Sequence, residues 1–367
     1  MSRYFIITLL FFFNGFISTG NTYEPPKATK YFEEWIKAYI PISKGFGPIP
    51  VEIIENKHPS EMIFGERDNF DQYLNRNNNQ SAVVLKNGKL TYETYNPQWG
   101  GSSDFLIHGQ SMTKTISGLT IGALICSKKL LSIDDPIGKY SETMKYTPYN
   151  NVSIKEALLM RSGTSKYNPE QGWKIWWMQT GNKKRGFEGK NYLKKYIKTI
   201  QNLNGKGIIS EYHPHDTFAL SIMVSELTSK SLAANFNEYI FSKIQPSGNI
   251  VWMMDAEGIT LPNGGLFLQA RDWAKIGDYI LQSLQKKNCM GKFIKDGIDN
   301  AVVSSRTKSW KFGYHFWTND ELIIMAGFGG QTIYINPKKK SVVMASSVNP
   351  KYNDKYIFEI ARDISLK

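Results

Sequence analysis

The spacing of hydrophobic residues predicts strands near both ends of this chain. Residues 81–95 (SAVVLKNGKLTYETY) form two strand-like runs around Asn87-Gly88, the dipeptide that favours a type I′ hairpin turn. Near the C-terminus, short aliphatic and aromatic runs typical of strands occupy residues 322–325, 332–335 and 341–346. We therefore expect an antiparallel sheet assembled from strands at the two ends of the chain.

The segments between these strands have the spacing of helices. A helix is expected to follow Ser111, because residues 116–125 are mostly apolar. Ser153 and Glu156 have the spacing of a capping box at the start of another helix. Helical patterns occupy residues 151–161, 217–227, 232–244, 271–284 and 353–364. The predicted fold class is α+β, an antiparallel sheet flanked by helices with an inserted, mostly helical region.

The N-terminal segment has the pattern of an export signal. Residues 1–20 combine a positive charge at Arg3, an apolar stretch and small residues at a cleavage site. The stretch is too short for a comfortable membrane span, so we expect cleavage, no stable membrane insertion afterwards, and a periplasmic or secreted protein. An uncleaved anchor is the alternative. Residues 21–75 are rich in Pro, Lys and Asn and predict an N-terminal extension that precedes one domain at 76–367.

Composition and charge exclude some functions without naming one. The formal net charge of +13 comes mostly from scattered lysines, and no basic arm or nucleic-acid-binding motif is present. We therefore expect a solvated surface and no nucleic-acid partner, although an anionic cell-wall polymer remains compatible with the charge. No His, Cys or Asp cluster has metal-ligand spacing, so no metal or cofactor is expected. The spacing of Cys126 and Cys289 leaves open whether they pair.

The tetrad Ser111-Met112-Thr113-Lys114 carries the candidate chemistry. Residues at positions i and i+3 lie on one face of a helix, so the Ser111 hydroxyl and the Lys114 amine can meet. A serine hydroxyl becomes a good nucleophile only when a nearby base takes its proton, and a lysine can do this if burial depresses its pKa. The tetrad alone also fits the start of an ordinary surface helix.

Three further segments place the tetrad in a recognisable order. They are Tyr212-His213-Pro214-His215-Asp216, the stretch from Gly264-Gly265 to Ala270-Arg271-Asp272, and Met325-Ala326-Gly327-Phe328-Gly329-Gly330. With the tetrad, this order resembles the serine β-lactamase and penicillin-binding-protein superfamily. More narrowly, it resembles the β-lactamase-related branch of class C-like enzymes, family VIII esterases and 6-aminohexanoate-dimer hydrolases. The resemblance covers residues 81–367 and includes segments 131–140, 153–163 and 252–271.

The resemblance implies a β-lactamase/transpeptidase-like fold and a role for each matching residue. Ser111 would be the acylated nucleophile and Lys114 the acceptor of its proton. Tyr212 would share the proton network and help to protonate the leaving group, and the choice of general base between Lys114 and Tyr212 stays open. The backbone N–H groups of Ser111 and Phe328 would form the oxyanion hole. Substrate would lie against Gly327 and Gly329 at a strand edge.

Two features of the sequence bear on the substrate. Met325 stands where the family's K-T-G motif has lysine, and Pro214 stands where its Y-x-N motif has asparagine. Both changes favour neutral esters or amides, since an anionic substrate would require another cation, such as Arg306 or Lys308, to reach the pocket. Trp176 and Trp177, in the polar insertion at 165–210, would either form an apolar wall for the substrate or only hold the insertion against the body.

These observations predict an exported serine hydrolase that cleaves a small-molecule ester or amide through a Ser111 acyl-enzyme. One alternative is a penicillin-interacting peptidase or β-lactamase that acts on cell-wall peptides. Another is an inactive relative that only binds a ligand. His213 and His215 would either line the pocket or occupy exposed or helix-capping positions. The substrate's identity and the oligomeric state stay open.

Overall fold

Two antiparallel sheets form the frame of the protein. The computed structural model describes residues 3–7, 49–56, 62–71, 79–97, 102–164, 192–201, 207, 209–255, 257–319, 321–347 and 355–367. The larger sheet has eight strands in the spatial order β4 (Lys89–Tyr95), β3 (Asn79–Lys86), β13 (Ser341–Ser347), β12 (Gln331–Asn336), β11 (Ile323–Gly327), β10 (Trp317–Thr318), β9 (Thr307–Phe312) and β8 (Val302–Ser304). The smaller sheet has the order β1 (Arg3–Ile7), β2 (Ile49–Ile54), β6 (Ile250–Met253), β7 (Leu266–Gln269) and β5 (Leu106–His108).

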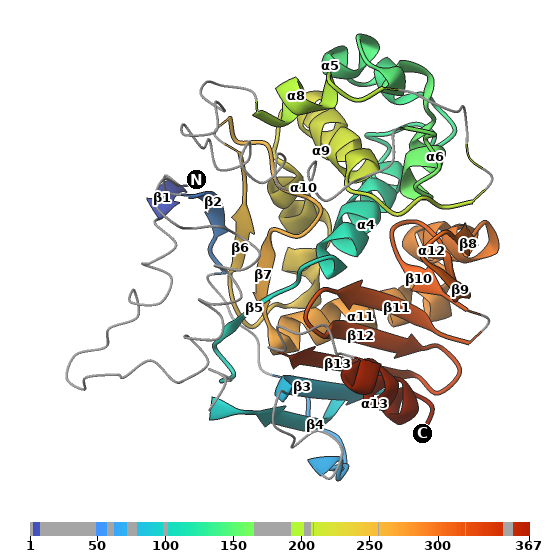
Figure 1. The fold of residues 1–367 in the computed structure, drawn as a ribbon. Helices are drawn as coiled ribbons and strands as arrows, with labels where there is room; N and C mark the ends of the chain where they lie inside the picture. Colours follow the sequence, from blue (N-terminus) through green and yellow to red (C-terminus); the bar gives the residue numbers. More distant parts are fainter. Residues whose placement is uncertain are drawn as a thin grey trace.

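Helices cover both sheets and fill the region between them (Figure 1). The α-helices are α4 (Met112–Cys126), α5 (Glu142–Lys145), α6 (Ile154–Leu158), α8 (Tyr192–Ile197), α9 (His215–Thr228), α10 (Leu232–Tyr239), α11 (Ala270–Lys286), α12 (Cys289–Asp299) and α13 (Lys355–Ser365). Short 3-10 helices occupy Ile137–Lys139, Pro148–Asn151 and Phe241–Ile244.

The larger sheet joins the two ends of the domain, as the sequence predicts. Strands β3 and β4 form the expected hairpin, and Asn87 and Gly88 adopt the positive φ values of 50° and 75° that a type I′ turn requires. Strand β3 then pairs antiparallel with β13, with Val84 opposite Val343. This pairing brings the N-terminal hairpin against the last strands of the chain.

Successive side chains along the strands of the larger sheet point to opposite faces, and both faces are buried. In β12, Ile333 and Ile335 belong to the main core, on the side of α11, whereas Tyr334 belongs to a second cluster. That second cluster includes Ile360 and Ile364 of α13. Figure 1 accordingly shows α13 and α11 on opposite sides of the sheet. Each fully buried aliphatic side chain contributes roughly 1.5–3 kcal/mol through its removal from water.

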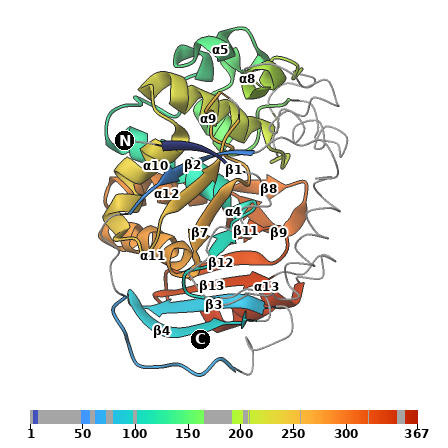
Figure 2. The same ribbon diagram turned by 90° about the vertical axis from the view of Figure 1, so that its left-hand side faces the viewer.

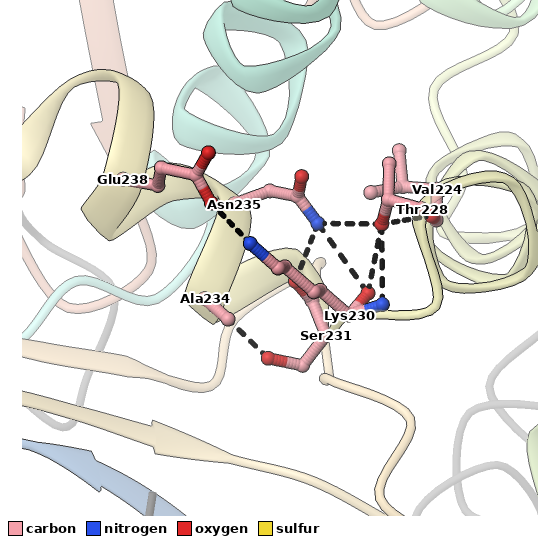
Figure 3. A network of polar contacts seen from close by, with 7 residues as sticks. All are labelled: Val224, Thr228, Lys230, Ser231, Ala234, Asn235 and Glu238. Atoms are coloured by element: carbon pink, nitrogen blue, oxygen red, sulfur yellow. Dashed lines mark hydrogen bonds and ion pairs between the residues drawn. The ribbon is translucent and has the colours of Figure 1, made fainter. Parts of the chain in front are cut away.

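The predicted helical insertion lies between β5 and β6 in the sequence. The capping box at the start of α6 is present, because Ser153 Oγ accepts from Glu156 N and the Glu156 carboxylate accepts from Ser153 N. The turn from α9 to α10 is closed by a polar network (Figure 3), in which Asn235 Nδ2 donates to Thr228 Oγ1 at 2.8 Å and to the Ser231 carbonyl at 2.9 Å. These bonds fix the direction in which α10 leaves α9.

The hydrophobic pattern of the sequence does not predict several of the observed elements. The smaller sheet, which faces the viewer in Figure 2, draws β2 from the predicted N-terminal extension and β1 from the predicted export signal. Strands β8 and β10 are very short and β9 is mostly polar, so none of the three has a strong periodic signal, and α12 was not predicted from the sequence. In the described part of the chain, no helix is long and apolar enough to span a bilayer.

A disulfide joins Cys126 at the end of α4 to Cys289 at the start of α12. The two residues are 163 positions apart, so the bond closes a long loop and ties the central helix to the helix that follows α11. A cross-link of this kind stabilises a fold mainly by restricting its unfolded chain.

Removal of this disulfide should destabilise the protein without altering its site. We expect the double variant Cys126→Ser, Cys289→Ser to lose about 2–5 kcal/mol of unfolding free energy, measured by urea titration. Wild type unfolded in the presence of dithiothreitol should fall to the level of the variant. Equal stability of the variant and the oxidised wild type would contradict this expectation.

Candidate active site

Ser111 lies where a tightly packed loop enters the central helix. It is the N-cap of α4, and its side chain is only partly buried. The preceding Gln110 has a φ of 49°, a conformation that costs most non-glycine residues free energy. The loop is held by a hydrogen bond from Gly109 N to Leu266 O at 2.9 Å, and a Cβ at Gly109 would lie 2.2 Å from the Trp273 ring. Packing therefore holds Ser111 at an accessible helix start.

Lys114 lies one turn further along α4, beneath Ser111. Its Nζ donates to Ser111 Oγ at 3.0 Å and to the carbonyl of Asn263 at 3.0 Å. The side chain is only 4% exposed. Burial lowers the pKa of Lys114, and the positive charge of Arg306 adds to this effect, while Tyr212 opposes it. The lowered pKa makes the neutral amine, the form able to accept a proton, more accessible near neutral pH.

Tyr212 reaches the same point from the segment that precedes α9. Its ring stacks on Trp317, with centroids 5.4 Å apart, and Phe312 packs edge-on at 5.6 Å. Lys114 Nζ lies 4.9 Å from the ring centroid. Burial raises the pKa of the Tyr212 hydroxyl, but the charge of Lys114 and a hydrogen bond with Ser111 outweigh it, so the pKa is lowered overall. The polar groups of Ser111, Lys114 and Tyr212 are therefore in mutual contact.

The end of β11 packs against the loop that carries Ser111. A Cβ at Gly327 would lie 2.5 Å from the Gly109 carbonyl oxygen and 3.0 Å from the Gln110 Cβ, so only glycine allows this close approach. Phe328 follows directly, and Gly329 turns the chain toward β12 with a φ of 79°. Gly327, which precedes Phe328, is therefore packed against Gly109 and Gln110, which precede Ser111. Trp176 and Trp177 lie outside the described residues.

Met325 and Pro214, the two residues that differ from the family's motifs, lie in different surroundings. Met325 is fully buried in the main core, together with Met112 and Ile116. Pro214 is the N-cap of α9 and has no side-chain capping bond. A cation does reach the site from elsewhere, because the Arg306 guanidinium carbon lies 4.8 Å from the centroid of the Tyr212 ring. No motif marks Arg306 in the sequence, so its place at the site depends on tertiary contacts.

Behind Tyr212, the start of α9 is a buried polar cluster. His215 Nε2 and the Tyr196 hydroxyl are 2.7 Å apart, and the Tyr149 hydroxyl donates to Asp216 Oδ1 at 2.7 Å. His213 Nδ1 accepts from His215 N at 3.2 Å, so His213 caps the helix from inside the protein. Both histidines are buried, which excludes the exposed positions considered for them.

Burial also sets the charges of this cluster. It lowers the pKa of His213 to about 4 and that of His215 to about 3, so both rings are neutral at pH 7. Burial raises the pKa of Asp216 to about 7, against hydrogen bonds from Ser162 and Tyr149 that lower it. The cluster therefore adds little positive charge behind the site, and Lys114 and Arg306 supply the positive charge around Tyr212.

The described residues offer little evidence for a further ligand. A cavity of about 360 Å³ does not include Ser111 in its lining, which consists of Met62, Phe64, Ser103, Asp104, Ser247, Gln269 and Arg271. No group of three or more His, Cys, Asp or Glu side chains in the described ranges could hold a metal ion.

The chain is similar to several known proteins in sequence and in fold. A 6-aminohexanoate-dimer hydrolase of Paenarthrobacter ureafaciens is 21% identical over 301 residues, 76% of this chain and 75% of that protein. A structure from Bacillus anthracis, provisionally named a 6-aminohexanoate-dimer hydrolase, has a TM-score of 0.74 at 19% identity, covering 95% of this chain and 97% of the other. A mutant class C β-lactamase has a TM-score of 0.60 at 13% identity, with 94% and 99% coverage.

These structural likenesses show a shared β-lactamase/transpeptidase-like fold, as the sequence predicts. The sequence profile of the Beta-lactamase family matches residues 67–362, most of the chain and every element of the site described above. The protein therefore belongs to the Beta-lactamase family and is a hydrolase of that fold.

Proposed function

We propose that this protein is a serine hydrolase that cleaves a small ester or amide through an acyl-enzyme on Ser111. The observation that carries the proposal is the 3.0 Å contact between Lys114 Nζ and Ser111 Oγ, in a partly buried network that includes Tyr212. In water at neutral pH a lysine is protonated and cannot accept a proton, but here its pKa and that of Tyr212 are both lowered. Either group can take the Ser111 proton as the oxygen attacks the acyl carbon.

The reaction then proceeds in two halves. Attack of Ser111 forms a tetrahedral intermediate, whose oxyanion the N–H groups of Ser111 and Phe328 would stabilise. The proton taken from Ser111 passes to the leaving alcohol or amine, which departs and leaves the acyl group on Oγ. Water attacks this ester and gives its proton to the network, and Ser111 is released with a carboxylic acid product. Tyr212, between Lys114 and Arg306, is the candidate for proton delivery to the leaving group.

A named relative and the residues around Ser111 bear on the class of substrate. The relative from Paenarthrobacter ureafaciens is named as the hydrolase of an amino-acid dimer, 6-aminohexanoate dimer, which supports amide as well as ester substrates for this chain. A penicillin-interacting peptidase or β-lactamase is less well supported, because Met325 is buried and uncharged where the family's lysine would stand. An inactive binding protein is disfavoured by the retained contacts among Ser111, Lys114 and Tyr212.

Export also belongs to this proposal. The N-terminal pattern of residues 1–20 predicts a cleaved signal, and the bond between Cys126 and Cys289 is of the kind that persists in oxidising compartments. We therefore propose that the enzyme acts in the periplasm or outside the cell.

Covalent labelling tests the nucleophile directly. A fluorophosphonate probe should label wild type at Ser111 and should not label Ser111→Ala, because the probe needs an activated hydroxyl. Intact-protein mass spectrometry would measure the adduct. Thr113→Ala, which removes another hydroxyl from the first turn of the same helix, is the matched control and should still be labelled. Equal labelling of Ser111→Ala would refute the assignment.

Removal of the Tyr212 hydroxyl should slow turnover and change its pH dependence. We expect Tyr212→Phe to lower kcat/KM by roughly 10²-fold or more, the usual scale for a proton-transfer group. In wild type, kcat/KM should rise with pH through a pKa below the ordinary values of 10.0 for tyrosine and 10.5 for lysine, because both pKa values are lowered in the site. An unchanged acylation rate in Tyr212→Phe would place the proton route on Lys114 alone.

Substrate selectivity gives a third test. Short neutral p-nitrophenyl esters should be hydrolysed measurably, whereas penicillins and nitrocefin should be turned over weakly, since no lysine occupies position 325 and no amide side chain position 214. Ser111→Ala provides the background rate for each compound. Efficient nitrocefin hydrolysis with feeble esterase activity would favour the β-lactamase alternative.

A further inference from the structure

The turn between β8 and β9 is fastened to the segment that carries Tyr212. Ser210 N donates to Val303 O at 2.9 Å, and Ser305 N donates to Ser210 O at 2.9 Å. Ser210 and Ser304 form a parallel bridge two residues before Tyr212. Ser304 Oγ in turn accepts from Arg306 N at 3.2 Å. The backbone at Arg306 is therefore fixed relative to Tyr212.

This attachment places a second cation at the rim of the site. The Arg306 guanidinium carbon lies 4.8 Å from the Tyr212 ring centroid, close to the 4.9 Å of Lys114 Nζ. Arg306 is exposed, whereas Lys114 is buried. In the described part of the chain, no carboxylate forms an ion pair with Arg306. The guanidinium is thus held at the site with donors available to a ligand.

We propose that Arg306 is a specificity-determining residue that binds a carboxylate carried by the leaving group of the substrate. This proposal rests on the proposed serine hydrolase function. A guanidinium presents a planar fork of N–H donors that matches a carboxylate in two parallel hydrogen bonds. Its contact with Tyr212, the candidate proton donor to the leaving group, assigns the carboxylate to that side of the scissile bond.

The position of Arg306 also favours some carboxylates over others. It approaches Tyr212 from the β8–β9 turn, whereas position 325 lies within β11 and is a buried methionine. A flexible leaving group can direct a terminal carboxylate toward the turn. The fused ring of a penicillin holds its carboxylate close to the scissile bond, where Met325 offers no charge. The preferred substrates are therefore esters or amides whose leaving group is a flexible chain that ends in a carboxylate.

A matched pair of esters tests this assignment. The acetyl ester of 3-(4-hydroxyphenyl)propanoate and that of its primary amide have nearly equal intrinsic reactivity, because two methylene groups separate the phenol from the charge. Wild type should prefer the carboxylate ester. Arg306→Gln should lower the ratio of kcat/KM values, carboxylate over neutral, by about 10-fold, mainly through KM. Arg306→Glu should lower it further, and Arg306→Lys should retain part of the preference.

Lys308→Gln is the control, since Lys308 is an exposed cation on β9 and its loss changes the net charge equally. It should leave the ratio within about 2-fold of wild type, because exposed charges at a distance are screened by salt. The ratio is compared at several pH values, since loss of the Arg306 charge also raises the pKa of Tyr212 for both esters alike.

The outcomes separate this proposal from the function on which it rests. If Arg306→Gln slows both esters equally, or leaves the ratio unchanged, the carboxylate site is refuted and the serine hydrolase stands. If wild type hydrolyses neither ester faster than Ser111→Ala, the proposed function fails, and the role of Arg306 fails with it.

Discussion

The burial of Lys114 beneath Ser111 is the constraint on which the rest of the site depends. A lysine that is 4% exposed has lost most of the hydration of its amine, and transfer of such a charge out of water costs several kcal/mol unless polar groups compensate for it. Ser111 Oγ and the Asn263 carbonyl supply that compensation at 3.0 Å each. The partners that stabilise the lysine include Ser111, the proposed nucleophile, so the proposal couples stability and chemistry at this point.

Other buried polar side chains of α4 also form hydrogen bonds with the surrounding segments. Thr115 Oγ1 donates to the carbonyl of His315 at 2.7 Å, and Ser117 Oγ donates to that of Pro262 at 3.0 Å. The segments before β7 and before β10 are thus hydrogen-bonded to the first turns of the central helix. Because α4 is almost wholly buried, these bonds form in a region of low dielectric, where an unpaired polar group would be costly.

The electrostatics of the site follow from this arrangement. Two cations approach the Tyr212 ring, and the neighbouring histidines are held neutral by burial. Positive charge near Tyr212 stabilises its phenolate and would equally stabilise an anion on a substrate. A site of this kind suits acyl transfer, in which negative charge develops on the reacting carbonyl oxygen.

Sequence alone determined the parts of this protein that depend on neighbouring residues. The Asn87-Gly88 hairpin, the capping box at Ser153 and the placement of Lys114 one helical turn after Ser111 all follow from short-range geometry. The α+β fold, with strands from both ends of the chain in one sheet, could also be predicted. Apolar periodicity and the order of several motifs can be read from the sequence without knowing how the elements pack.

Only the tertiary structure decided which distant residues meet. The bond between Cys126 and Cys289, the smaller sheet and the approach of Arg306 to Tyr212 have no local signal. Each depends on how helices and sheets pack, and packing is set by the sum of many weak contacts rather than by the spacing of any one motif. For that reason the Ser111–Lys114 pair could be predicted from local spacing and the order of the motifs. The sequence could name Arg306 only as one of two candidate cations and could not place it beside Tyr212.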